Sequence, residues 1–153
     1  MQPTPQPEFV DDFTLEAAGH YSHLAAIRQT VLDLCARAGC AQEKASQLEM
    51  AVDEACTNII EHSYGPGKSQ LAQATPDAIR IHFHHTAGRI VVEIFDRGDG
   101  FDFSGTPDVP PASYLDERRQ RGLGMYIIRC FVDGADYQRA TPLGNCLRLT
   151  KLF

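Results

Sequence analysis

The chain has 153 residues, 43% hydrophobic and 22% charged, a composition that fits one globular domain with an ordinary core. Fourteen Lys and Arg against twenty Asp and Glu give a formal net charge of −6, which argues against a general nucleic-acid binder that relies on phosphate neutralisation. No run of about 18 apolar residues occurs, and no basic segment with an apolar core opens the chain, so we expect neither a membrane span nor a secretion signal.

The cysteines are odd in number and show no C-x-x-C spacing, which predicts neither a zinc ribbon nor a disulfide framework. They are Cys35, Cys40, Cys56, Cys130 and Cys146. We therefore expect reduced thiols in a cytoplasmic protein.

The N-terminal half begins with a tail and continues with helices. Three prolines within the first seven residues predict a flexible tail over residues 1–8, which leaves 9–153 as one domain. Residues 9–15 have the mixed pattern of a short edge strand. From His20 to Ala38, apolar residues recur at three- and four-residue steps, and Gly39 follows, as expected of an amphipathic helix with a glycine stop.

A second helix is predicted from Ala41 to about His62, with a broad apolar face, and a Gly-Pro-Gly sequence breaks it. Residues 68–77 form a polar connection. Alternating apolar and polar residues from Ala78 to His85, a two-residue Ala-Gly turn, and the β-branched run from Arg89 to Phe95 predict an antiparallel hairpin.

The C-terminal part begins with a stretch that has no periodicity, from Asp102 to Arg121, and we expect a surface loop there. A third helix follows from Gly122 to Val132. Two strand-like runs close the chain, residues 135–140 and 145–152.

The hairpin ends in a turn that looks suited to binding a ligand. Asp96 places a carboxylate at the end of an apolar strand, and Gly98 and Gly100 follow at two-residue steps. Glycines there allow positive φ and a close approach of the backbone to a ligand. The same pattern also occurs in ordinary loops, so by itself it leaves both interpretations open.

The second helix carries a polar line, because Glu54, Asn58 and His62 stand at four-residue steps and share one stripe. The line is either a solvated helix face or a site in which the Asn58 amide oxygen ligates Mg²⁺ and Glu54 orients or deprotonates a nucleophile.

Two glycines at the start of the third helix, Gly122 and Gly124, sit beside Arg121. Unpaired amides and the dipole of a helix N-terminus favour phosphate, although glycine is also common at loop entries. His82, His84 and His85 suggest a metal, but no cysteine or carboxylate completes the set at ligand spacing, which favours an exposed strand face.

The order of these motifs carries a resemblance. The helix with E-A-x-x-N-x-x-x-H-x-Y from Glu54, the strand ending in D-x-G-x-G from Asp96, and R-G-L-G from Arg121 resemble the N, G1 and G2 boxes of the Bergerat-type (GHKL, histidine-kinase-like) ATPases. Within that superfamily the chain is similar to the anti-sigma-factor serine/threonine kinases. The resemblance implies an α/β two-layer sandwich, with helices on one face of a mixed, mainly antiparallel sheet.

The same resemblance implies roles for single residues. Asp96 would accept a hydrogen bond from the adenine amino group, and Asn58 would coordinate Mg²⁺ on the ATP phosphates. Glu54 would be the general base. The remaining nucleotide-binding residues would be Gly98, Gly100, Arg121, Gly122, Leu123 and Gly124.

The resemblance implies a kinase that phosphorylates a STAS-type anti-anti-sigma antagonist, sequesters a sigma factor, and forms a homodimer without contacting nucleic acid or membrane. One alternative is a binding regulator that uses ATP or ADP to set its affinity for a partner, without any phosphoryl transfer. A plain structural adaptor is a further alternative, which failure to bind adenine nucleotides would favour.

Overall fold

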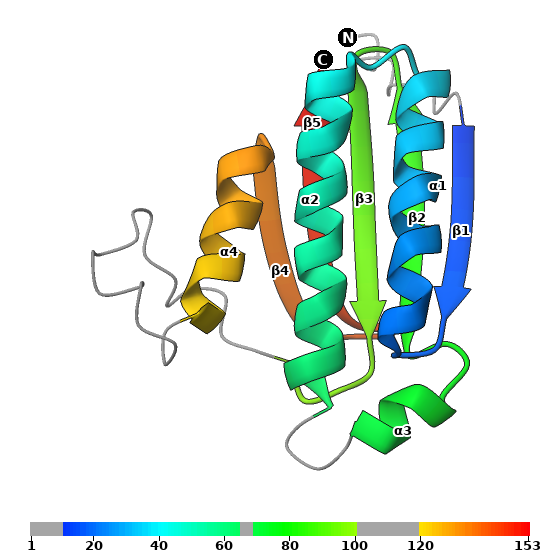
Figure 1. Cartoon of the computed structure of the whole chain (residues 1–153), viewed down its shortest axis with the longest axis vertical. Helices are drawn as coiled ribbons and strands as arrows, with labels where there is room; N and C mark the ends of the chain where they lie inside the picture. The colour runs from blue at the N-terminus through cyan, green and yellow to red at the C-terminus, as the bar shows by residue number, and fades with distance from the viewer. Residues whose placement is uncertain (1–10, 65–68, 101–119) are drawn as a thin grey trace, which may run out of the picture.

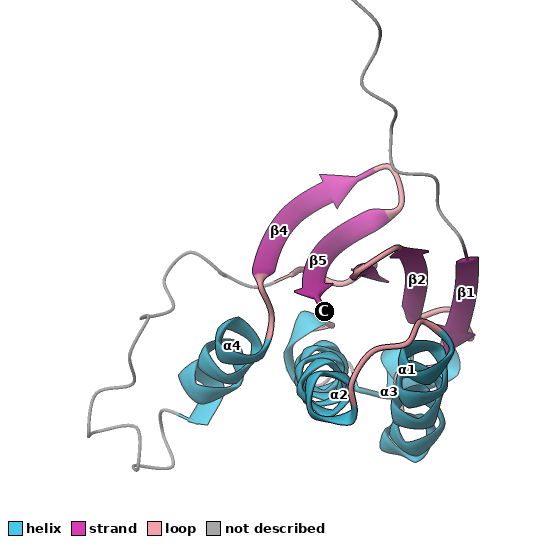
Figure 2. Ribbon diagram, turned by 90° about the horizontal axis from the view of Figure 1, so that it is seen from above, coloured by secondary structure: helices cyan, strands magenta, loops and turns pink. Residues whose placement is uncertain are grey.

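The computed structural model describes residues 11–64, 69–100 and 120–153. The predicted tail over residues 1–8 and nearly all of the predicted loop over 102–121 lie outside these ranges. The described elements form two layers, a sheet and a group of helices that covers one of its faces (Figures 1 and 2). The predicted two-layer α/β sandwich is confirmed.

The sheet has five strands in the order β1-β2-β3-β5-β4. The strands are β1 (Asp11–Ala17), β2 (Ile79–Thr86), β3 (Arg89–Asp96), β4 (Gly134–Thr141) and β5 (Gly144–Leu152). All four pairings among the described strands are antiparallel, so the sheet has no parallel component where a mixed one was expected. The predicted β2–β3 hairpin is present, with Thr86 opposite Arg89 across the two-residue turn.

The helices are η1 (Tyr21–His23), α1 (Leu24–Arg37), α2 (Gln42–Asn58), η2 (Ile59–Ser63), α3 (Ser69–Ala74) and α4 (Gln120–Phe131). Viewed along the layers, α2 lies between α1 and α4 (Figure 2). Its apolar stripe is fully buried at Leu48, Val52 and Cys56, and it faces strand residues such as Val92 and Leu149 that are also fully buried. Each buried Leu or Val side chain among them contributes about 1.5–3 kcal/mol by leaving water. The core therefore fixes α2 against the middle of the sheet.

Sequence reasoning missed α3, because it treated residues 68–77 as an irregular connection. Six residues are too few to show helical periodicity. Tertiary contacts hold this helix, since Ala72 is fully buried and its carbonyl accepts a hydrogen bond of 2.9 Å from the Gly19 amide.

The last turn of the second helix departs from α geometry. Helical structure extends to Ser63, one residue beyond the predicted end at about His62, but Ile59–Ser63 (η2) is a π-helical turn. A π-turn bonds residues five apart rather than four, so the line from Glu54 through Asn58 does not continue to His62 at α-helical spacing. Ser63 is instead fully buried.

Among the helices that the structure describes, none combines the length and the hydropathy that crossing a bilayer would require.

Candidate functional site

Asp96 ends β3 with a carboxylate that is only 3% exposed. Its Oδ1 atom accepts hydrogen bonds from the Ser63 hydroxyl, from the Gly98 amide at 2.9 Å and from Asn145 Nδ2 at 3.1 Å. Three donors offset the desolvation of a buried carboxylate. No residue in the described ranges donates to Oδ2, so this oxygen keeps lone pairs that an N–H group of a ligand could use.

The turn after Asp96 packs tightly on the end of the second helix. A Cβ atom at Gly98 would overlap the backbone of Ser63, and the Asp99 amide donates to the Ser63 carbonyl at 2.5 Å. Asn145 Nδ2 also reaches the Gly98 carbonyl at 2.9 Å. Glycine is therefore required at position 98 by this contact within the protein.

Gly100 needs glycine for a different reason, because its φ is +75°. The expected positive φ is therefore found at Gly100 and not at Gly98. A Cβ atom at Gly100 would also lie 2.6 Å from the Tyr137 hydroxyl. The turn is thus held between η2 on one side and the β4–β5 hairpin on the other.

Asn58, the last residue of α2, is 8% exposed. Its Nδ2 atom is buried and finds no hydrogen-bond partner in the described part of the chain. A buried amide left without a partner costs about 1–3 kcal/mol. Because the two ends of an asparagine amide are interchangeable by rotation, the same position can present the oxygen to a ligand.

Glu54 lies one turn before Asn58 and is partly buried. Burial raises the pKa of its carboxyl group, and the negative charges of Asp53 and Glu61 raise it further. A carboxylate whose pKa is shifted towards neutrality is a better proton acceptor near pH 7.

The start of α4 lies against these two side chains. A Cβ atom at the buried Gly124 would be 2.9 Å from Glu54 Oε2 and 3.5 and 3.6 Å from the two polar atoms of the Asn58 amide. The absence of a side chain at Gly124 therefore makes room for Glu54.

The helix begins at Gln120, two residues before the predicted start. Arg121, Gly122 and Leu123 consequently belong to its first turn, where Gly122 falls among the amides that lack partners within the helix. The side chains of Arg121 and Leu123 lie outside what the structure describes.

The predicted residues thus form two groups joined by η2. Glu54, Asn58 and Gly124 are in contact range of one another, and Asp96 with its turn is bonded to Ser63, five residues after Asn58. Both groups depend on the end of a single helix for their positions.

Sequence reasoning gave no role in the site to three residues that organise this region: Ser63, Tyr64 and Asn145. The Tyr64 hydroxyl donates to the Ala78 carbonyl at 2.8 Å and so ties the helix end to the start of β2. Asn145 is the register partner of Asp96. Tyr64 belongs to the helix motif and was visible there, whereas the Asn145 contact follows from strand register, which one sequence does not contain.

A separate cavity of about 500 Å³ lies between the turn after Asp96 and the β4–β5 turn. Arg97, Arg139 and Asn145 are among its lining residues, but neither Glu54 nor Asn58 is. We therefore do not place the nucleotide in it.

An antiparallel sheet covered on one face by helices, with a carboxylate at a strand end and an asparagine-bearing helix beside a glycine-rich helix start, is the architecture of the histidine-kinase-like ATPases. The chain belongs to this family, whose model, described as Histidine kinase-like ATPase domain, matches residues 18–151, and within it to the RsbW serine-protein kinases. The family assigns ATP as the nucleotide.

The curated relatives are similar over most of their length. Serine-protein kinase RsbW of Bacillus subtilis (strain 168) is 27% identical over 145 residues, covering 92% of this chain and 85% of the relative. The protein of the same name from Bacillus thuringiensis (strain Al Hakam) is 30% identical over 136 residues, covering 84% and 77%.

Two solved structures share the fold. The RsbU and RsbW domains of Rv1364c from Mycobacterium tuberculosis match with a TM-score of 0.64 and 14% identity, over 94% of this chain and 32% of that longer one. The SiaB–SiaC complex from Pseudomonas aeruginosa matches with a TM-score of 0.55 and 14% identity, over 95% and 91%.

Proposed function

We propose that this chain is an ATP-dependent serine/threonine protein kinase that acts as an anti-sigma factor. It transfers the γ-phosphoryl group of ATP to a hydroxyl of a STAS-type anti-anti-sigma antagonist, and it sequesters a sigma factor. The observation that carries the proposal is the approach of Gly124 to Glu54 and Asn58, because it puts a helix start suited to phosphate next to a base and an oxygen ligand. The names of the curated relatives support it.

Recognition of adenine is assigned to Asp96. Its Oδ1 atom is occupied by three donors that orient the carboxylate, which leaves Oδ2 for the exocyclic amino group of the base. The turn with Gly98 and Gly100 holds this carboxylate by fixing the backbone on both sides.

The donor set at the end of α2 fits Mg²⁺. The Asn58 amide is buried without a partner, and Mg²⁺ prefers oxygen ligands while keeping several of its waters. Bound there with ATP, the ion would neutralise charge on the phosphates. Asn58 would hold it through Oδ1, and Arg121, Gly122, Leu123 and Gly124 would form the phosphate-binding start of α4.

Glu54 is the proposed general base. Its Oε2 atom would take the proton of the incoming hydroxyl, a task for which the raised pKa of its carboxyl suits it. Phosphoryl transfer depends mainly on positioning and on charge stabilisation, so the contact between α2 and α4 would set the rate by holding Glu54 in place.

The remaining parts of the proposal concern assembly. Residues 9–153 would form the kinase domain, and the protein would act in the cytoplasm as a homodimer. The binding of a sigma factor and of a STAS-type antagonist follows the family resemblance, and the names of the two structural neighbours are consistent with it.

The test uses γ-labelled ATP, Mg²⁺ and a purified STAS-domain antagonist. The full chain should label the antagonist. Glu54→Gln should abolish labelling and still bind ATP. Glu49→Gln should label normally, because Glu49, which is on the same helix as Glu54, pairs with Arg28 of α1 away from the site. Labelling by Glu54→Gln at the parental rate would refute the assignment. ATP binding by the parent without any labelling would favour the nucleotide-gated regulator instead.

A further inference from the structure

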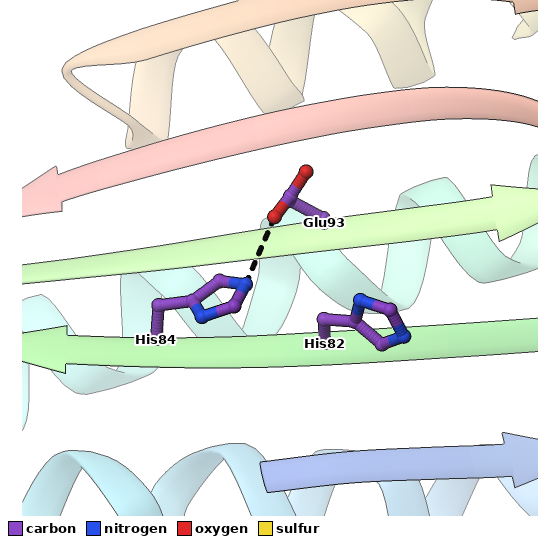
Figure 3. A group of neighbouring side chains, drawn as sticks. All are labelled: His82, His84 and Glu93. Atoms are coloured by element: carbon purple, nitrogen blue, oxygen red, sulfur yellow. Dashed lines mark hydrogen bonds and ion pairs between the residues drawn. The ribbon is translucent and has the colours of Figure 1, made fainter. Parts of the chain in front are cut away.

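The sheet face opposite the helices carries a compact polar group. His82 and His84 project from β2 on this face, because they alternate with Ile81 and Phe83, which are buried in the core. Glu93 of β3 is the direct register partner of His82 (Figure 3). The group is thus built by two adjacent strands, away from the helix layer that carries Glu54 and Asn58.

These three side chains supply the completed ligand set that the sequence pattern lacked. One ligand atom from each of His82, His84 and Glu93 lies within 4.8 Å of the other two. Along the chain no carboxylate stands at ligand spacing from the histidines. Across the sheet, Glu93 lies close enough to complete the set. Glu93 is nine residues beyond His84, and only the hairpin register brings it close.

Neighbouring side chains already orient two of the ligands. His84 Nδ1 lies 2.6 Å from Asp12 Oδ1, and His84 Nε2 lies 2.9 Å from Glu93 Oε1. On the other carboxylate oxygen, Glu93 Oε2 accepts from Arg148 at 3.3 Å. A carboxylate on the far nitrogen of a histidine fixes the tautomer and increases the basicity of the metal-binding nitrogen.

The third ligand is held by packing. The ring of His82 packs against that of Phe95 in a tilted arrangement, with centroids 4.9 Å apart and an angle of 56° between the planes. All three candidate ligands are only partly buried, so an ion could reach them from solvent.

We propose that His82, His84 and Glu93 bind a divalent transition-metal ion, with Zn²⁺ the best match. Two imidazoles and one carboxylate form a common zinc set, with a fourth position left for water or a further ligand. Atoms bonded to tetrahedral zinc at about 2.0–2.1 Å lie roughly 3.3 Å apart, so small side-chain rotations close the group around the ion. Asp12 and Arg148 act as positioning residues, and the bound ion joins β2 to β3 and, through Asp12, to β1.

The site is tested on the full chain by calorimetric titration with Zn²⁺ and by the absorption spectrum with Co²⁺. We expect one ion per chain, with a tetrahedral cobalt spectrum that lacks the charge-transfer band of thiolate ligands. His82→Ala, His84→Ala and Glu93→Gln should each weaken binding at least about tenfold, and Asp12→Asn should weaken it about 10- to 100-fold. Thermal unfolding followed by circular dichroism, measured in parallel, reports whether each variant is folded.

His85→Ala is the matched control. His85 lies on the same strand but on the other face, where its ring stacks on Phe153, so its loss should leave zinc affinity unchanged. The proposal would be overturned if zinc binding were undetectable or if the cobalt spectrum showed a thiolate band. It would also be overturned if His82→Ala bound zinc with the affinity of the parent. None of these results bears on the kinase, because the two sites lie on opposite faces of the sheet.

Discussion

Replacing Gly124 with alanine separates the geometry of the proposed kinase site from the stability of the fold. The added Cβ atom would lie 2.9 Å from Glu54 Oε2, whereas ordinary contacts begin at 3.4 Å, so the carboxylate has to move by about 0.5 Å. A misplacement of 1 Å at a reacting group can lower a rate about 100-fold, so we expect Gly124→Ala to lower the transfer rate roughly tenfold or more.

The same substitution should leave the protein folded. Gly124 is inside a helix and does not have positive φ, so alanine gains about 0.5–1 kcal/mol of helix propensity. For a chain of this size, this gain would raise Tm by up to about 4 °C. Displacement of the Glu54 side chain would reduce that rise. We therefore expect a variant that transfers the phosphoryl group slowly but has a stability close to or above that of the parent.

The assays are phosphoryl transfer to the antagonist and thermal unfolding followed by circular dichroism. Gly134→Ala is the control, since its Cβ atom would make only an ordinary contact of 3.5 Å with Thr150 in β5. Parental transfer by a folded Gly124→Ala protein would refute the reasoning, because Glu54 would then not react from its place beside α4. Unfolding of that variant would equally contradict the described contact.

Three further predictions concern single side chains. Asp96→Asn should weaken ATP affinity about 10- to 100-fold in a titration, because an amide presents an N–H group where the adenine amino group needs an acceptor; unchanged affinity would remove Asp96 from the adenine site. Because the pKa of Glu54 is raised in the folded state, its protonated form is the one that folding favours, and that contribution is lost as pH rises through the raised pKa. Glu54→Gln should therefore have a higher Tm than the parent at pH 7, with the difference closing as pH falls below the usual range for glutamate; a lower Tm at pH 7 would contradict this. Lys151 is 6% exposed and donates to the Phe131 carbonyl and to Gln47, both at 2.6 Å. Lys151→Ala should therefore lower the free energy of unfolding, measured in urea, by about 2–3 kcal/mol. Lys44→Ala, at an exposed position, should lower it by about 0.5 kcal/mol or less.

Local patterns predicted most of the elements because the physical signal is itself local. Apolar and polar residues alternate along β2, and apolar residues recur every three or four positions along α1 and α2. These patterns indicate which side of each element is apolar. The predicted bounds accordingly agree with the structure to within a few residues. Where the signal is too short, as in α3, the prediction failed, since burial of Ala72 against Gly19 decides that helix.

The functional motifs were also recognised from their order, but their contacts were not. The helix with Glu54, the turn after Asp96 and the helix start at Arg121 could be named from the chain alone. That Gly98 packs on Ser63, and that a π-turn directs this serine to Asp96, depends on how two elements 33 residues apart meet.

By itself the sequence determined which residue types stand at the strand end, on the polar line of α2 and at the start of α4, because spacing within one element is a property of the chain. The tertiary structure alone decided which residues meet across elements: Asn145 with Asp96, Gly124 with Glu54, and Glu93 with the histidines of β2. Strand register and helix packing set these contacts, and both are determined by burial of the whole core rather than by any local segment.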